Sequence, residues 1–182
     1  MYADDKELLR QFNQTDTKER AFTAIIQKYQ EKLYWHVRRL VVVHDDANDV
    51  LQNVFIKVWN GLNKFREDSH LYTWLYRIAT NESLSFLEKL KRNGTISLDE
   101  EGSEGLSNQL RADSHFDEKK LEWRLQLAIQ HLPERQRLVF NLRYYDEMPY
   151  QDMSRMLETS EGSLKASYHH AARKIEEFIK NY

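Results

Sequence analysis

The sequence predicts an all-α protein, for two reasons. Glycine and proline account for only 5 and 2 of the 182 residues, too few for the many turns of a β protein. Most apolar residues recur every three to four positions, which is the spacing of an amphipathic helix. Hydrophobic residues make up 41% of the chain and aromatic residues 12%, enough to build packed cores. We expect two small helical domains joined by a flexible acidic linker.

The first expected domain covers residues 1–92. Apolar residues at helical spacing across 22–40 predict one long amphipathic helix. The polar stretch "HDDAND" interrupts this pattern, and Asp45 or Asp46 is expected to cap the next helix. That helix should end near Gly61. A polar connection, "NKFREDSH", then leads into "LYTWLYRIATNESLSFLEKLKR", which predicts a further helix.

Residues 93–118 form the expected linker. They lack apolar periodicity and hold three of the five glycines beside serine, asparagine and acidic residues. Residues 99–118 contain seven acidic residues and one arginine, whereas each flanking part has slightly more lysine and arginine than acids. The formal net charge of −2 therefore conceals two mildly basic domains, and it does not exclude nucleic-acid binding.

The helical period returns in residues 119–182. Pro133 and Pro149 suit the starts of two helices, and Ser160 suits the N-cap of the last one. A short helix, a turn and a longer helix make a helix-turn-helix pattern. The outer face of the last helix combines small and cationic residues that fit a DNA major groove, although an ordinary solvated face explains the pattern equally well. These residues are Ser163, Lys165, Ala166, His169, His170 and Arg173.

Two upstream motifs also have a functional and a structural interpretation. In "FREDSHLYTWLYRIATN", aromatic residues beside cations and amides suit unpaired bases, but Leu75, Tyr76 and Ile78 are better explained as core. For Trp74 and Asn81 both explanations stay open. The helix "DANDVLQNVFIKVW" has a polar stripe with one apolar residue, which suits a partner helix or simply solvent. The stripe consists of Asp49, Gln52, Asn53 and Ile56.

We expect no enzymatic activity, no cofactor and no metal. The chain has no cysteine, no glycine-rich phosphate loop and no HExxH motif. The acids Asp45, Asp46 and Asp49 lack the glycine of a calcium loop. The N-terminus does not resemble a signal peptide, and no apolar run reaches the roughly 18 residues that span a bilayer. A cytoplasmic protein without membrane insertion is expected.

Taken in order, the three motifs resemble the sigma-70 family of RNA polymerase sigma factors, specifically its small extracytoplasmic-function (ECF) group. "DANDVLQNVFIKVW" is similar to the polymerase-binding helix of region 2. "FREDSHLYTWLYRIATNESLSFL" is similar to the segment that recognises and melts the −10 element. "LPERQRLVFNLRYYDEMPYQDMSRMLETSEGSLKASYHHAARKI" follows the region 4 pattern. The resemblance covers nearly the whole chain outside the linker.

This resemblance implies roles for matching positions. The stripe from Asp49 to Ile56 would contact the clamp helices of the largest polymerase subunit. Region 4 would contact the flap of the second polymerase subunit. Region 4 would read the −35 element through the outer face of its last helix. Region 2 would hold a flipped base of the −10 element, with Trp74 shaping the surface. The −10 residues are Phe65, Arg66, Asp68, Ser69, His70, Trp74, Arg77 and Asn81.

The implied function is promoter-directed initiation: binding core RNA polymerase, recognising −10 and −35 promoter DNA, and nucleating strand separation. An anti-sigma factor is a candidate partner, and the linker would thread the basic interior channel of the polymerase. The alternative is a dimeric helix-turn-helix regulator of duplex operator DNA, which explains only residues 119–182. A third class is a helical protein-interaction module without a nucleic-acid role.

Overall fold

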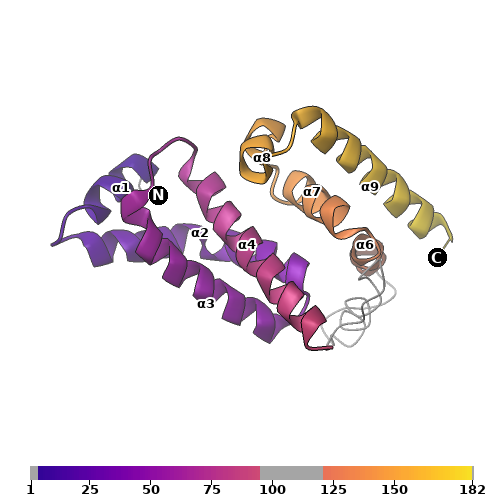
Figure 1. Cartoon of the computed structure of the whole chain (residues 1–182), viewed down its shortest axis with the longest axis horizontal. Helices are drawn as coiled ribbons and strands as arrows, with labels where there is room; N and C mark the ends of the chain where they lie inside the picture. Colours follow the sequence, from indigo (N-terminus) through magenta and orange to yellow (C-terminus); the bar gives the residue numbers. More distant parts are fainter. Residues whose placement is uncertain (1–3, 95–120, 182) are drawn as a thin grey trace.

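The computed structural model describes residues 4–94 and 121–181, and within them every regular element is a helix. Two groups of helices lie side by side, with α7 between α4 and α9 (Figure 1). The first group contains α1 (Asp5–Phe12), α2 (Lys18–Val41), α3 (His44–Gly61), the 3-10 turn η1 (Leu62–Lys64) and α4 (Leu71–Arg92). The second contains α6 (Leu121–Gln130), α7 (Glu134–Tyr144), α8 (Tyr150–Leu157) and α9 (Glu161–Asn181).

The expected helices of the first group are confirmed. One long helix, α2, covers residues 22–40, and α4 runs through the whole predicted segment from Leu71 to Arg92. The short helix α1 was not expected as a separate element, because eight residues hold too few helical turns to show a period. Its buried residues Leu8, Leu9 and Phe12 pack into the same core. Apart from residues 93 and 94, the expected linker lies outside the described residues.

One capping prediction is wrong and another is confirmed. Helix α3 begins at His44 with Val43 as its N-cap, so Asp45 and Asp46 lie inside the first turn. The prediction failed because acidic residues are favoured at the N-cap and also in the first turn, where they interact with the positive end of the helix dipole. Their presence therefore does not tell the two positions apart. At α9, the backbone N–H of Ser163 donates to the Ser160 hydroxyl at 3.2 Å, as an N-cap serine requires.

A single cluster of buried apolar side chains extends from the first helical group into the second. It joins Val37 and Leu75 of the first group to Val139 and Met153 of the second, and each of these four residues is completely buried. The two groups therefore pack against each other through apolar surface. Their division into separate domains at 1–92 and 119–182 stays a prediction. No helix in the described ranges is long and apolar enough to cross a membrane.

Candidate nucleic-acid interface

Helix α9 presents the predicted −35 residues on one exposed face. Its inward side buries Leu164, Ala171 and Ile175, so helical geometry turns the opposite side to solvent. All six predicted residues are exposed: Ser163, Lys165, Ala166, His169, His170 and Arg173. The cations among them are held only loosely. Lys165 lies 3.8 Å from Glu161, and surface pairs of this kind are weak enough to exchange for phosphate contacts.

A hollow of about 440 Å³ lies between α7 and the same face of α9. It is lined by Gln136 of α7 and by four residues of α9, His170, Arg173, Lys174 and Glu177. Three of the four are basic residue types, so the hollow suits an anion such as a DNA phosphate. Sequence reasoning missed Gln136 and Lys174. Lys174 follows Arg173 directly in the chain, whereas no local pattern connects Gln136 to this face.

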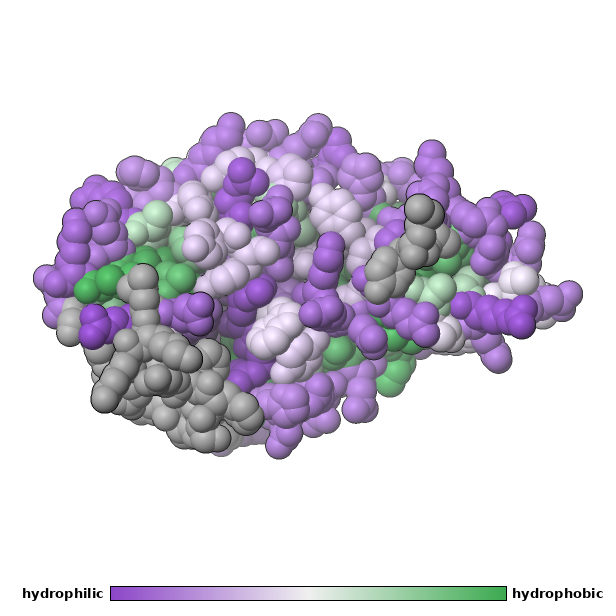
Figure 2. Space-filling model, turned by 180° about the vertical axis from the view of Figure 1, so that it is seen from behind, coloured by the Kyte–Doolittle hydropathy of each residue, from purple (hydrophilic) through white to green (hydrophobic). Residues whose placement is uncertain are grey.

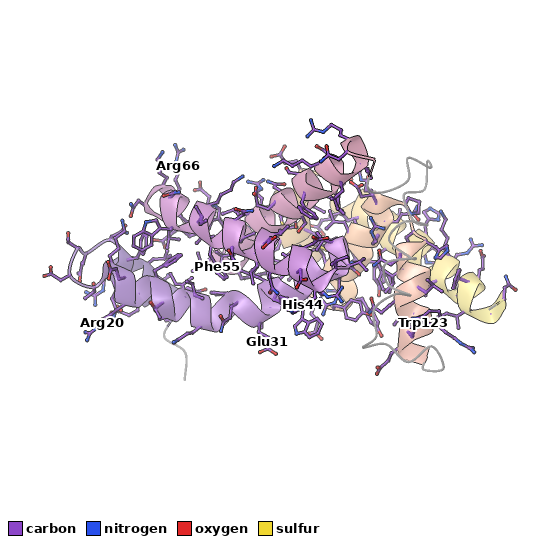
Figure 3. The ribbon with its side chains drawn as sticks, turned by 90° about the horizontal axis from the view of Figure 1, so that it is seen from below. Arg20, Glu31, His44, Phe55, Arg66 and Trp123 are labelled. Carbon is purple, nitrogen blue, oxygen red and sulfur yellow. The ribbon has the colours of Figure 1, made fainter. Side chains whose placement is uncertain are left out.

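The predicted −10 loop connects η1 to α4. Arg66, Asp68 and His70 are exposed in it, and Arg66 projects away from the helices (Figure 3). Phe65 packs against Trp74, with ring centroids 5.3 Å apart. The Trp74 ring also lies against Gly61, because a Cβ atom added to Gly61 would be 3.2 Å from the ring. Trp74 is therefore held by packing rather than extended towards solvent.

The start of α1 closes one side of this loop. A hollow of about 360 Å³ lies beside the loop. It is lined by residue 65 and residues 67–71, by residues 4–6 and 9 of the N-terminal segment, and by Arg155 of α8. Asp5 is held there by hydrogen bonds from the Tyr29 hydroxyl at 2.7 and 2.8 Å and from Lys28 at 2.7 Å. Burial, helped by Asp5, raises the pKa of Tyr29, which keeps its hydroxyl a donor. No local pattern in the sequence indicates that α1 reaches this loop.

Arg77 is bonded to α8, although 43% of its side chain is accessible to solvent. Its guanidinium donates to the carbonyls of Arg155 at 2.9 Å and Met156 at 3.2 Å, and to Glu158 at 3.3 Å. Those carbonyls belong to the last turn of α8, where helix backbone acceptors lack partners. Arg77 therefore caps α8 in this structure. Asn81, one turn further along α4, remains exposed.

Two tyrosines of α4 also bond to acidic residues of the second group. The Tyr72 hydroxyl donates to Asp152, and the Tyr76 hydroxyl donates to Asp146 at 3.2 Å. Burial, reinforced by the bond to Asp152, raises the pKa of Tyr72 to about 12. Burial also raises the pKa of Tyr76, and the charge of Asp146 adds to the effect. Both hydroxyls stay protonated near neutral pH and act as donors.

The stripe on α3 forms a third surface, away from the helix-turn-helix. Asp49, Gln52 and Asn53 are exposed, and 58% of Ile56 is accessible to solvent. The valines of α3 are buried on the opposite side. An exposed isoleucine among polar residues is a feature of partner-binding helices. On the face shown in Figure 2, apolar surface occurs only in small patches separated by hydrophilic side chains.

The fold defines a helix-turn-helix protein with a second helical group. The family described as "Sigma-70 region 2" matches residues 25–93, and "Sigma-70, region 4" matches residues 122–175. The RNA polymerase sigma-H factor of Pseudomonas aeruginosa is 28% identical over 97% of this chain and 94% of its own. The ECF RNA polymerase sigma-E factor of Escherichia coli is 29% identical with the same coverage.

Solved structures share the fold. The sigma factor RpoE of Bartonella quintana, in complex with the anti-sigma factor NepR, aligns with a TM-score of 0.68 at 19% identity. That alignment covers 87% of this chain and 96% of RpoE. CnrH, in complex with the cytosolic domain of CnrY, gives a TM-score of 0.70 at 19% identity over 97% of both chains. The present chain belongs to the sigma-70 family, in its extracytoplasmic-function group.

Proposed function

We propose that this protein is an ECF sigma factor that binds core RNA polymerase, directs it to promoters with −10 and −35 elements, and nucleates strand separation. The observation that carries the proposal is the pair of family matches, one on each helical group, at 25–93 and 122–175. The first match includes the α3 stripe and the loop before α4, and the second includes the outer face of α9. The protein contributes binding and positioning, and the catalysis belongs to the polymerase.

Polymerase binding is assigned to the α3 stripe. Its members Asp49, Gln52, Asn53 and Ile56 share one exposed face, as a helix that packs against partner helices requires. Ile56 supplies apolar area at one end of the stripe, and the polar residues that precede it would fix orientation. The relatives are named RNA polymerase sigma factors, which supports the same partner for this chain.

Strand separation is assigned to the loop before α4 and to Asn81. A flipped base costs unstacking energy, which a pocket of aromatic and hydrogen-bonding groups offsets for a base of the right shape. The hollow beside residues 65–71 contains an aromatic edge, a hydroxyl and an imidazole, from Phe65, Ser69 and His70. In this proposal Trp74 holds the loop in shape, and Arg77 contacts DNA only after it leaves α8.

Recognition of the −35 duplex is assigned to α9. Ala166 and Ser163 leave room for the helix to enter the major groove, where Lys165 and His169 would meet base edges. His170 and Arg173 line the hollow that also contains Lys174 and Gln136, so these residues suit the neighbouring phosphate. Lysine lacks the bidentate fork with which arginine selects guanine, so Lys165 should discriminate less sharply.

An anti-sigma factor is proposed as a further partner, because RpoE, a structural neighbour, was solved with one. The dimeric operator-binding regulator accounts for α8 and α9 but gives the α3 stripe no function. A helical protein-interaction module without a nucleic-acid role gives the basic face of α9 no function. Neither alternative predicts a match to sigma-70 region 2 over residues 25–93.

Run-off transcription tests the proposal. The purified full chain is combined with bacterial core polymerase and a library of promoter fragments. We expect transcripts that require the chain and start downstream of a shared pair of elements. Ile56→Asp serves as a matched negative control, because the exposed position tolerates the change. Failure to stimulate any template, with a helical circular-dichroism spectrum, would contradict the sigma assignment.

A further inference from the structure

A hollow of about 420 Å³ lies where the end of α2 meets α6 and the end of α7. Its residues belong to none of the surfaces assigned above, which are the α3 stripe, the loop before α4 and the outer face of α9. In Figure 3, the end of the first group at which His44 begins α3 lies next to the helix that carries Trp123, α6. Binding sites for small molecules have volumes of roughly 300–1,000 Å³, so the hollow is large enough for one.

Exposed aromatic surface gathers at this hollow. Among the residues that the structure describes, three large apolar side chains are well exposed: Trp35, Ile56 and Tyr144. Ile56 belongs to the α3 stripe, whereas Trp35, 48% exposed, and Tyr144, 50% exposed, both line the hollow. Aromatic surface that water contacts beside a hollow is a feature of binding sites.

The aromatic wall is held in place before any ligand binds. The rings of Tyr144 and Tyr145 meet edge to face, with centroids 4.9 Å apart and an interplanar angle of 89°. The Arg39 guanidinium lies over the Tyr145 ring, 4.1 Å from its centroid. The side-chain amide of Gln126 donates to the Tyr145 hydroxyl at 2.7 Å. Rings that are already fixed lose little conformational freedom on binding, which favours affinity.

Hydrogen-bond donors lie beside the same wall. Burial raises the pKa of Tyr145 to about 12, so its hydroxyl stays protonated at neutral pH. That hydroxyl accepts from Gln126, which leaves its own proton for an acceptor on a ligand. Arg39 donates to Asp146 at 3.3 Å, and its guanidinium has further N–H groups in the same plane. The hollow therefore favours a ligand that carries an acceptor group.

The charges around the hollow indicate which acceptor group fits. The charged residues that line it are two arginines, Arg38 and Arg39, and one glutamate, Glu122. Their formal charge is one positive, which suits a single carboxylate better than a cation or a phosphate dianion. An arginine guanidinium binds a carboxylate through parallel hydrogen bonds. The aromatic rings suit a planar ring that stacks on them or meets them edge to face.

We propose that this hollow binds a planar aromatic carboxylate. The ring lies against Trp35 and Tyr144, and the carboxylate is bound by Arg38, Arg39 and the Tyr145 hydroxyl. The site is separate from the proposed function and goes beyond it. Its walls come from α2 of the first group and from α6 and α7 of the second, so the ligand contacts both groups at once.

The first test uses 2-naphthoate as the probe and 2-naphthamide as its neutral counterpart of nearly the same shape. Nuclear magnetic resonance of the isotope-labelled full chain follows the indole N–H signals of its 4 tryptophans, and Trp35→Phe identifies the signal of Trp35. We expect 2-naphthoate to shift this signal saturably, with a Kd on the order of 1 mM. We expect 2-naphthamide to bind about tenfold more weakly, because it lacks the charge.

Trp59 is the internal control, because its ring packs against Phe12 and Phe22 of α1 and α2, away from the hollow. Its signal should stay in place. Three outcomes would each overturn the proposal. They are an equal shift of the Trp59 and Trp35 signals, equal binding of the two compounds, and absence of saturation at about 10 mM, tenfold above the expected Kd.

A second test separates charge from apolar contact with Arg38→Gln. Arg20→Gln is the matched control, because it removes the same charge from an exposed position at the far end of α2 (Figure 3). We expect Arg38→Gln to bind 2-naphthoate about fivefold more weakly and 2-naphthamide unchanged. Equal affinities of the two variants for 2-naphthoate would overturn the carboxylate site. Circular dichroism checks folding, and the comparison of the two compounds on the unaltered chain needs neither variant.

A second copy of the chain is the other candidate occupant, since exposed aromatic rings also occur at dimer interfaces. Analytical ultracentrifugation of the unaltered chain and of Trp35→Glu distinguishes the two occupants. We expect both proteins to be monomeric at the concentration used for the titrations. A dimer of the unaltered chain that Trp35→Glu abolishes would make the hollow an interface between copies and overturn the ligand proposal.

Discussion

His36 and Asp146 lie 110 positions apart in the chain, yet the Nδ1 atom of His36 is 3.0 Å from a carboxylate oxygen of Asp146. The imidazole is completely buried, and its Nε2 atom lies 2.9 Å from the Thr80 hydroxyl. Asp146 also contacts Arg39 and Tyr76. One carboxylate from the α7–α8 connection therefore joins three side chains of the first helical group. This contact fixes how the two groups sit against each other.

Replacement of Asp146 by asparagine should lower the stability of the protein. The change removes the charge that Arg39 faces and replaces one of the two acceptor oxygens by an amide donor in a buried site, which costs about 2 kcal/mol. Urea unfolding followed by circular dichroism measures the loss. The adjacent Glu147 is exposed, so Glu147→Gln should change stability by less than about 0.5 kcal/mol. Equal effects of the two variants would contradict a structural role for Asp146.

The Tyr72 hydroxyl should titrate late, because its pKa is raised to about 12 from an ordinary value of 10.0. A raised pKa in the folded protein contributes stability that is fully present below pH 10.0 and is lost as pH rises through 12. Absorbance of the phenolate, taken as the difference from Tyr72→Phe, follows the titration. Asp152→Asn should shift it to lower pH. If the unaltered protein and Asp152→Asn gave the same Tyr72 titration curve, Asp152 would have no influence on the pKa of Tyr72.

Gly61→Ala should disturb the −10 loop through Trp74. The new methyl carbon would lie 3.2 Å from the indole ring, so the ring has to move, at a cost of about 1–2 kcal/mol. Tryptophan fluorescence and thermal unfolding detect the shift. At Gly162 an added Cβ meets nothing within 4 Å, which makes Gly162→Ala the control. An unchanged melting temperature in both variants would mean that Trp74 moves freely.

Ile56→Asp should weaken polymerase binding without affecting folding. The side chain is 58% exposed, so the folded protein loses little, whereas an apolar contact buried in an interface contributes about 1–2 kcal/mol, a loss of roughly tenfold in affinity. Biolayer interferometry with immobilised core polymerase provides the measurement. Asn60→Asp adds the same charge to α3 at another exposed position and serves as control. If the control loses as much affinity, charge rather than Ile56 explains the effect.

Arg173→Ala and Lys165→Ala should weaken −35 binding in different ways. Loss of a phosphate contact at Arg173 should reduce affinity for all sequences and lower the salt slope by about 0.9. Loss of Lys165 should alter which sequences are preferred. Duplex binding at several salt concentrations, followed by selection from a random pool, separates the two effects. Lys180→Ala, near the far end of α9, should alter neither the salt slope nor the sequence preference. If Lys180→Ala lowered the salt slope as much as Arg173→Ala, the assignment of a phosphate contact to Arg173 would be wrong.

The sequence alone determined the longer helices and the exposed faces of α3 and α9. Their periods are local: residues three and four positions apart share a face whatever the rest of the chain does. For this reason α2 and α4 were predicted correctly, and Ser160 was recognised as an N-cap. The separation of the α9 outer face from its buried side followed in the same way. Short α1 lacked enough turns for this reasoning, and the choice between cap and first turn at Asp45 depends on backbone geometry.

Only the tertiary structure decided which side chains of the first helical group contact which side chains of the second. The contact of Arg77 with the end of α8, and that of His36 with Asp146, join residues far apart in the chain. No local pattern encodes such pairs, because they depend on how apolar faces of separate helices pack. Gln136 joined the α9 hollow for the same reason. The sequence thus specified the surfaces, and packing decided that Arg77 bonds to the end of α8.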